Sequence, residues 1–166
     1  MGHLFSVDIK HNISFPRLSL IVSGGNTQLV FSRSVISHHV LGLTMDDAVG
    51  EALDKTARLL NCNWSESGGL GKELEKIASR GKPLQLNINT LRNYKDPLSF
   101  SFSGLKTALK LFILDENNFL ISQEDLAATI QDTLFGHLVD RVKNCFELLQ
   151  NCNLNIKTLS YIKTNE

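Results

Sequence analysis

Residues 15–35 read FPRLSLIVSGGNTQLVFSRSV. An apolar β-prone run, a tight-turn signal at SGGN and an alternating run are typical of two strands joined as a hairpin. A third extended piece at residues 38–43 would complete a small antiparallel meander. The adjacent glycines have no Cβ, so a ligand can approach the backbone, and successive N–H groups can form an anion-binding nest. An ordinary hairpin turn explains the same glycines, and both interpretations stay open on this motif alone.

Helical spacing begins after residue 43. Apolar side chains recur every three or four residues over residues 49–60, which predicts an amphipathic helix. Thr44 is expected to cap it, because Asp46 and Asp47 would then fall in the first turn, where acidic side chains suit the helix dipole. The helix should end near Asn61.

Three further helices and a strand are expected in the rest of the chain. The first covers residues 70–78, and the second begins at Ser103. The third begins at Ser122, which has the pattern of a side-chain cap. Residues 154–162 read LNIKTLSYI, the pattern of a strand. Residues 81–100 are polar and irregular and are expected as an insertion.

The composition excludes several classes of protein. A chain of 166 residues suits one compact domain, and 17 basic residues balance 17 acidic ones, which excludes a strongly basic nucleic-acid module. The longest apolar runs fall far short of the roughly 18 residues of a membrane span, so none is expected. Cys62, Cys145 and Cys152 are too widely spaced for a disulfide framework or a CxxC metal site, and we expect reduced thiols.

Two clusters of polar residues could carry chemistry. Asp47, Glu51 and Asp54 fall within two turns of the first predicted helix. Ser103 stands at a helix start with Lys106 in the first turn, an arrangement that can contact an oxyanion or a phosphate. The alternatives are ordinary helix-start charges for the carboxylates and an ordinary cap for the serine.

Four segments occur in an order that resembles one family. They are FPRLSLIVSGGNTQLV, LGLTMDDAVGEALDKTARLL, SGG at residues 67–69 and FSFSGLKTAL. They are similar to segments of the TsaD/Gcp family (Kae/Qri-type, O-sialoglycoprotein endopeptidase-like), the tRNA N6-adenosine threonylcarbamoyltransferases. The resemblance implies an α/β fold, a ribonuclease-H-like lobe of the actin-like ATPase (ASKHA) class with a mixed β-sheet, an N-terminal β-meander and packed helices. Residues 1–14 would be a remnant of the first lobe and its metal motif, and residues 15–166 a partial second lobe with residues 81–100 inserted.

The resemblance also implies a transferase. The family moves a threonylcarbamoyl group from threonylcarbamoyl-adenylate to N6 of the adenosine that follows the anticodon in ANN-decoding tRNAs. The implied partner is tRNA, with a homodimer as a further expectation and no membrane, and the implied ligand is threonylcarbamoyl-adenylate or ATP. The motifs are closer to the bacterial and mitochondrial branch, so the expected location is mitochondrial, with the cytoplasm as the alternative.

Substrate-binding residues are implied by position in these motifs. They are Ile21, Val22, Ser23, Gly24, Gly25, Asp54 and Gly69. No catalytic residue is implied. Asn26 stands where the family usually has histidine, and its amide can bond a ligand but cannot titrate near neutral pH.

The family's divalent metal ion is held by an HxxxH histidine pair and a later aspartate. His3 resembles the second histidine, so the resemblance implies a ligand for iron, zinc or magnesium. The first histidine would lie upstream of Met1 and the aspartate beyond Glu166. The chain would then be an incomplete enzyme, and a non-catalytic truncated isoform that acts as an interaction module is the alternative. A third, weaker alternative is a kinase-like ATP-binding lobe that acts on another substrate.

Overall fold

The computed structural model describes residues 14–62, 69–86 and 96–163. A four-stranded sheet has the order β3-β2-β1-β4. The strands are β1 (Arg17–Val22), β2 (Thr27–Ser34), β3 (Ser37–Leu43) and β4 (Thr158–Lys163). The first three form an antiparallel meander, and β4 pairs with β1 in parallel. The predicted hairpin, third strand and final strand are all confirmed, and the sheet is mixed.

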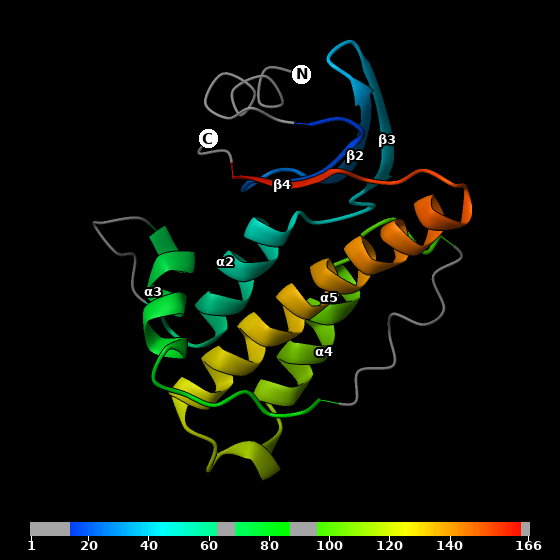
Figure 1. The fold of residues 1–166 in the computed structure, drawn as a ribbon. Helices are drawn as coiled ribbons and strands as arrows, with labels where there is room; N and C mark the ends of the chain where they lie inside the picture. Colours follow the sequence, from blue (N-terminus) through cyan, green and yellow to red (C-terminus); the bar gives the residue numbers. More distant parts are fainter. Residues whose placement is uncertain (1–13, 63–68, 87–95, 164–166) are drawn as a thin grey trace.

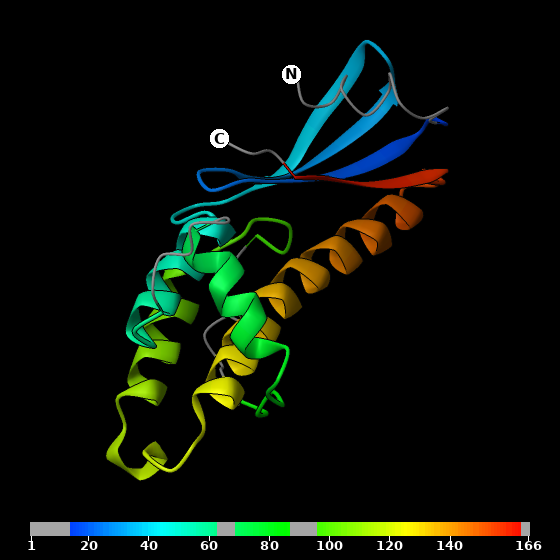
Figure 2. The same ribbon diagram turned by 90° about the vertical axis from the view of Figure 1, so that its left-hand side faces the viewer.

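The helices gather on one side of the sheet (Figures 1 and 2). They are α2 (Val49–Leu59), α3 (Gly69–Ala78), α4 (Ser103–Ile113) and α5 (Gln123–Asn151), with a short 3-10 helix η2 (Glu116–Asn118) between the last two. Helices α4 and α5 form an antiparallel pair whose connection lies at the end far from the sheet, and α5 returns the chain to β4. This is the α/β arrangement of sheet and packed helices that the sequence predicts.

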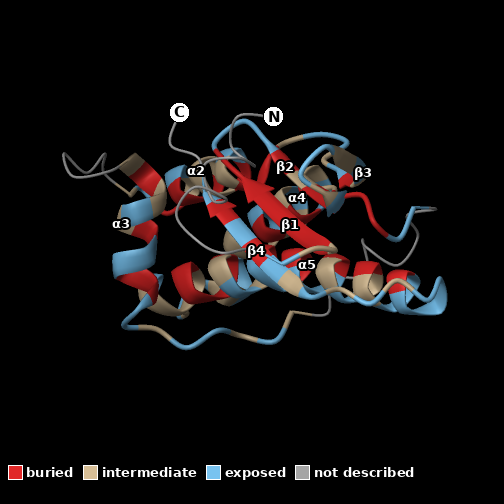
Figure 3. Cartoon of the chain, turned by 45° about the horizontal axis from the view of Figure 1, so that its top comes forward, coloured by how far each residue is buried: buried red, intermediate tan, exposed pale blue. Residues whose placement is uncertain are grey.

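The central strand β1 is buried along its whole length, as Figure 3 shows. Leu18 and Leu20 belong to the main core with the apolar faces of the helices. Ile21 faces the other way and packs with Val30 and Ile162 in a second, smaller cluster. Burial on both faces explains why β1 reads as a continuous apolar run rather than as an alternating one.

The first helix begins later than the sequence predicts. Thr44 still belongs to the sheet region, because it forms an isolated bridge with Phe100, and α2 begins at Val49. Thr44 therefore does not cap the helix, and its hydroxyl donates to the carbonyl of Asp47 at 2.5 Å. The N–H of Val49 is bound instead by the Thr27 hydroxyl oxygen at 3.0 Å, from a neighbouring strand. The prediction was wrong because the cap is distant in sequence.

Residues 96–102, the segment before α4, are irregular, but they contribute to the core. Phe100 and Phe102 are fully buried. The Phe100 N–H donates to the Leu43 carbonyl at 3.1 Å, and the Met45 N–H donates to the Phe100 carbonyl at 2.9 Å. The segment therefore lies along the end of β3 and delivers two aromatic side chains to the core. In the described part of the chain, no helix has the length and hydrophobicity that a membrane span requires.

The start of α5 confirms its predicted cap and allows a test. The Ser122 hydroxyl oxygen accepts the Asp125 N–H at 3.1 Å. We expect Ser122→Ala to lower the free energy of unfolding by about 1 kcal/mol, because one helix-end donor loses its partner. Urea denaturation measures the change, and Ser122→Asp, which keeps an acceptor, should remain within a few tenths of a kcal/mol of the wild type. Equal losses in both variants would contradict the capping role.

Candidate functional site

The β1–β2 turn exposes its backbone. The Ser23 N–H donates to the Asn26 carbonyl at 2.7 Å, and the Gly25 N–H donates to the Ser23 hydroxyl at 3.2 Å. Gly24, Gly25 and Asn26 are exposed, whereas Ser23 is buried. A Cβ added to Gly24 would meet no atom within 4 Å, so open space lies in front of this glycine. The turn can therefore receive a ligand against its main chain.

The first turn of α2 packs directly behind the turn. A Cβ on Gly50 would lie 2.8 Å from the Ser23 carbonyl oxygen and 2.9 Å from the Gly24 Cα. Both are backbone atoms, so a glycine is needed for this close approach. Together with the bond from Val49 to Thr27, this contact fixes the start of the helix against the hairpin.

Asp54 connects the same face of α2 to the start of α3. It lies four residues after Gly50, and residues at this spacing share a helix face. A Cβ on Gly71 would lie 3.7 Å from Asp54 Oδ1, so the carboxylate stands beside the first turn of α3. Gly69, the first residue of α3, has a φ of 82°, a left-handed conformation that glycine adopts without strain. The hairpin, Asp54 and Gly69 are thus linked through α2.

Two of the predicted substrate-binding residues do not present their side chains at the turn. Ile21 points into the small cluster on the far face of the sheet, and Val22 belongs to the main core. Any contact they make with a ligand would therefore come from their backbone. His3, the predicted metal ligand, lies outside the described residues.

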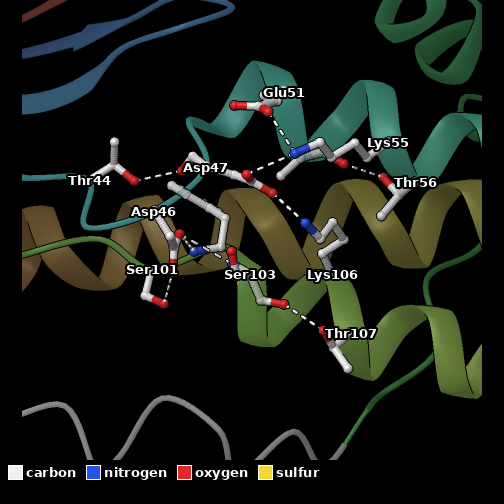
Figure 4. Close-up of polar contacts among 12 residues, drawn as sticks. Thr44, Asp46, Asp47, Glu51, Lys55, Thr56, Ser101, Ser103, Lys106 and Thr107 are labelled. Atoms are coloured by element: carbon white, nitrogen blue, oxygen red, sulfur yellow. Dashed lines mark hydrogen bonds and ion pairs between the residues drawn. The ribbon is translucent and has the colours of Figure 1, made fainter.

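A network of carboxylates and lysines joins α2 to α4 (Figure 4). Asp47 accepts from Lys55 Nζ at 2.8 Å and from Lys106 Nζ at 2.5 Å. Lys55 also pairs with Glu51 at 2.6 Å, within α2. The hydrogen bonds from Lys106 and Lys55 hold the pKa of the Asp47 carboxyl below its usual value, so Asp47 is charged at neutral pH.

Asp46 caps α4 from a distant loop. One carboxylate oxygen accepts the N–H groups of Phe102 and Ser103 at 2.8 Å and 3.2 Å, and the other accepts the Ser101 hydroxyl at 2.6 Å. These bonds favour the ordinary helix-start interpretation of Ser103 and Lys106 over contact with a bound oxyanion or phosphate. The Ser103 N–H binds Asp46 and Lys106 Nζ binds Asp47, so each of these donor groups has an anionic partner within the protein.

The described residues provide neither a metal centre nor a reactive thiol pair. Within residues 14–62, 69–86 and 96–163, no group of three or more histidine, cysteine or acidic side chains could hold an ion. Cys62, Cys145 and Cys152 are all free, as predicted. Burial raises the pKa of the Cys145 thiol to about 11, which keeps it protonated and unreactive at neutral pH.

Sequence reasoning missed three residues that shape the site: Thr27, Gly50 and Asp46. Gly50 carries a local signal, because a glycine inside a helical pattern costs stability and often marks a close approach. Thr27 and Asp46 carry no comparable signal. Their partners lie 22 residues away in one case and 56 and 57 residues away in the other.

The sequence is similar to those of known proteins that share one description. A family model described as tRNA N6-adenosine threonylcarbamoyltransferase matches residues 1–164. A curated protein of that name from Orientia tsutsugamushi is 39% identical over 160 residues, which are 94% of this chain and 45% of the relative. One from Staphylococcus epidermidis is 38% identical over 135 residues, which are 80% of this chain and 38% of the relative. One from Mesomycoplasma hyopneumoniae is 33% identical over 167 residues, covering 98% and 50%. The chain spans about half the length of the curated relatives it matches.

Proposed function

The chain belongs to the tRNA N6-adenosine threonylcarbamoyltransferase family, and on this basis we propose that it binds the adenylate of a threonylcarbamoyl-transfer reaction at the β1–β2 turn. In this reaction N6 of a tRNA adenosine attacks the carbamoyl carbonyl, the bond to the adenylate phosphate breaks, and AMP leaves while N6 loses a proton. The observation that carries the proposal is the exposed Gly24–Gly25 backbone with open space before Gly24.

Each part of the site has a defined task in this proposal. The N–H groups of Ser23 and Gly25 are bound within the turn, so the remaining N–H groups of the turn are the donors that face the phosphate. The negative charge of the phosphate grows as AMP departs, and preorganised donors stabilise such charge. Asp54 accepts hydrogen bonds from the ribose or the threonyl group. Gly69 lets the backbone at the start of α3 come close to the ligand. No side chain is assigned to proton transfer.

Gly24→Val tests the binding site without disturbing the fold. The valine side chain has room, since no atom lies within 4 Å of its Cβ, and Gly24 is not among the glycines with a positive φ. We expect the Kd for ATP, measured by calorimetry, to rise at least about tenfold, a loss of roughly 1.4 kcal/mol, because the side chain fills the space before the turn. Unfolding by urea should be nearly unchanged.

Gly136→Val is the matched control. Gly136 is exposed on α5, and its Cβ also meets nothing within 4 Å. This variant should bind ATP as the wild type does. If Gly24→Val binds ATP with unchanged Kd, the ligand does not lie against the turn.

Transfer to tRNA is tested in cells. Removing the gene that encodes this chain should abolish threonylcarbamoyl-adenosine in ANN-decoding tRNAs, as measured by mass spectrometry of tRNA digests. Re-expression of the wild type or Gly136→Val should restore the modified nucleoside, and Gly24→Val should not. Full restoration by Gly24→Val would separate the turn from the reaction.

An interaction module is the second candidate function. Among the described strands β4 pairs only with β1, and its Leu159 and Tyr161 are 53% and 62% exposed. An apolar edge strand of this kind is a template for pairing with another chain. Such a module would form a homodimer or a complex whose assembly, seen by size-exclusion chromatography with light scattering, is lost in a Leu159→Lys, Tyr161→Lys double variant. A monomer at all concentrations would remove this candidate.

A metal ion and a location complete the proposal. We propose that His3 supplies one ligand to a divalent iron, zinc or magnesium ion, and elemental analysis of His3→Ala against the wild type tests it. We also propose a mitochondrial location, supported by the similarity to bacterial relatives, which fractionation of cells that express the tagged protein tests.

A further inference from the structure

We propose that Asp46 and Asp47 are positioning residues for the phosphate-binding turn. They fix the loop before α2 to α4, and this determines where Gly50 meets Ser23 and Gly24. The inference rests on the proposed function for its effect on ligand binding. Its effect on the geometry of the turn is independent of that function.

Asp46 binds the loop to the start of α4 through three donors. Two are backbone N–H groups and the third is the Ser101 hydroxyl. A carboxylate at a helix N-terminus also interacts favourably with the helix dipole. The three partners are the consecutive residues 101–103, so Asp46 fixes where the start of α4 lies relative to the loop before α2.

Asp47 adds a second connection from the adjacent residue. Its side chain is only 14% exposed and lies between Lys55 of α2 and Lys106 of α4. Lys55 has Glu51 as a further partner within α2. Removing the Asp47 charge therefore breaks the bridge from Lys55 to Lys106 but leaves the Lys55–Glu51 pair of α2 intact.

The loop passes this constraint directly to the turn. The Thr44 N–H donates to the Thr27 carbonyl at 2.9 Å, and the Thr44 hydroxyl donates to the Asp47 carbonyl. Thr27 in turn holds the Val49 N–H, and Gly50 follows in contact with the backbone of the turn. Only two residues lie between Asp47 and Gly50, so we expect a displacement of residues 46 and 47 to reach Gly50.

Asp46→Ala, which removes the acceptor, and Asp47→Asn, which removes the charge, test the proposal in the 166-residue chain. Amide spectra of 15N-labelled protein report on Gly24 and Gly25 without any ligand, and calorimetry with ATP reports on binding. We expect the two glycine resonances to shift in both variants and the Kd for ATP to rise about fivefold, the lower end of typical coupling effects. Asp47→Glu, which retains the charge, should recover most of the affinity.

Asp115→Asn is the control. Asp115 accepts the Asn117 N–H at 2.9 Å at the start of η2, so it is also a capping carboxylate but stands at the far end of α4. It should leave the resonances of Gly24 and Gly25 and the Kd unchanged. If Asp47→Asn does not fold, Lys106→Gln breaks the Asp47–Lys106 pair from the α4 side.

The outcomes separate the two proposals. Folded Asp47→Asn or Lys106→Gln protein with unshifted Gly24 and Gly25 amides overturns the positioning role of Asp47, and the same result in folded Asp46→Ala protein overturns that of Asp46, even if the melting temperature falls. A wild-type chain that does not bind ATP overturns the proposed ligand site, while the amide shifts measured without ligand still decide the positioning role.

Discussion

Gly42→Ala is expected to lower the free energy of unfolding by about 3 kcal/mol, the upper end of overpacking effects. A Cβ at this position in β3 would lie 2.1 Å from the Leu98 carbonyl oxygen and 2.7 Å from its carbonyl carbon. Both atoms belong to the backbone, so no side-chain rotation can relieve the contact. The segment that contains Leu98, residues 96–102, would have to move away from β3, and the buried Phe100 and Phe102 would move with it.

The measurement is urea denaturation, with Gly136→Ala as the matched control. The new methyl group on exposed Gly136 meets no atom within 4 Å, and alanine is a better helix former than glycine by about 1 kcal/mol. The same substitution should therefore destabilise the protein at one site and stabilise it at the other. Gly42→Ala with wild-type stability would show that the segment does not pass this closely over β3.

Local patterns predicted the elements because each pattern depends on residues near one another in sequence. The turn needs SGGN between two β-prone runs, and the start of α5 needs Ser122 three residues before Asp125. Both are confirmed. The start of α2 was predicted too early because Asp46 and Asp47 resemble the acidic first turn of a helix. Their side chains instead bind the start and the first turn of α4.

Contacts across the fold could not be predicted in the same way. A glycine in β3 gives no sign of which carbonyl will approach it, and the two aspartates give no sign that α4 will be their partner. The predicted sharing of one site by the turn, Asp54 and Gly69 came from the family resemblance. The structure adds the physical link, which is the face of α2 that carries Gly50 and Asp54.

His137 on α5 is a buried ionisable group that contacts Ser101 and Phe102, just before α4. Its Nε2 accepts the Ser101 N–H at 3.2 Å, so this nitrogen must be unprotonated. The ring meets Phe102 edge-on with centroids 5.2 Å apart. Among the described residues, Nδ1 has no hydrogen-bond partner. Burial first, and then the charge of Arg141, lower the pKa of His137 to about 4, against the opposing effect of Asp140 and Asp46.

Protein stability is therefore expected to fall as the pH drops from 6.5 to 4. The unfolded chain takes up a proton on His137 near its ordinary pKa of 6.5, whereas the folded chain does so only near 4. The contribution is fully present above pH 6.5, declines through this interval and is gone below about pH 4. Since one unit of pKa difference corresponds to about 1.4 kcal/mol, the total loss is roughly 3 kcal/mol.

His137→Gln isolates this contribution, since glutamine retains an acceptor but does not titrate. The lowered pKa values of the Asp47, Asp96 and Asp125 carboxyls act in a different interval, because their contributions are lost only as the pH falls below about 3.8. Urea denaturation at pH 7, 5.5 and 4.2 should therefore give a much flatter profile for His137→Gln than for the wild type. Parallel profiles would mean that His137 is solvated or charged in the folded protein, and the Ser101 N–H would then need another acceptor.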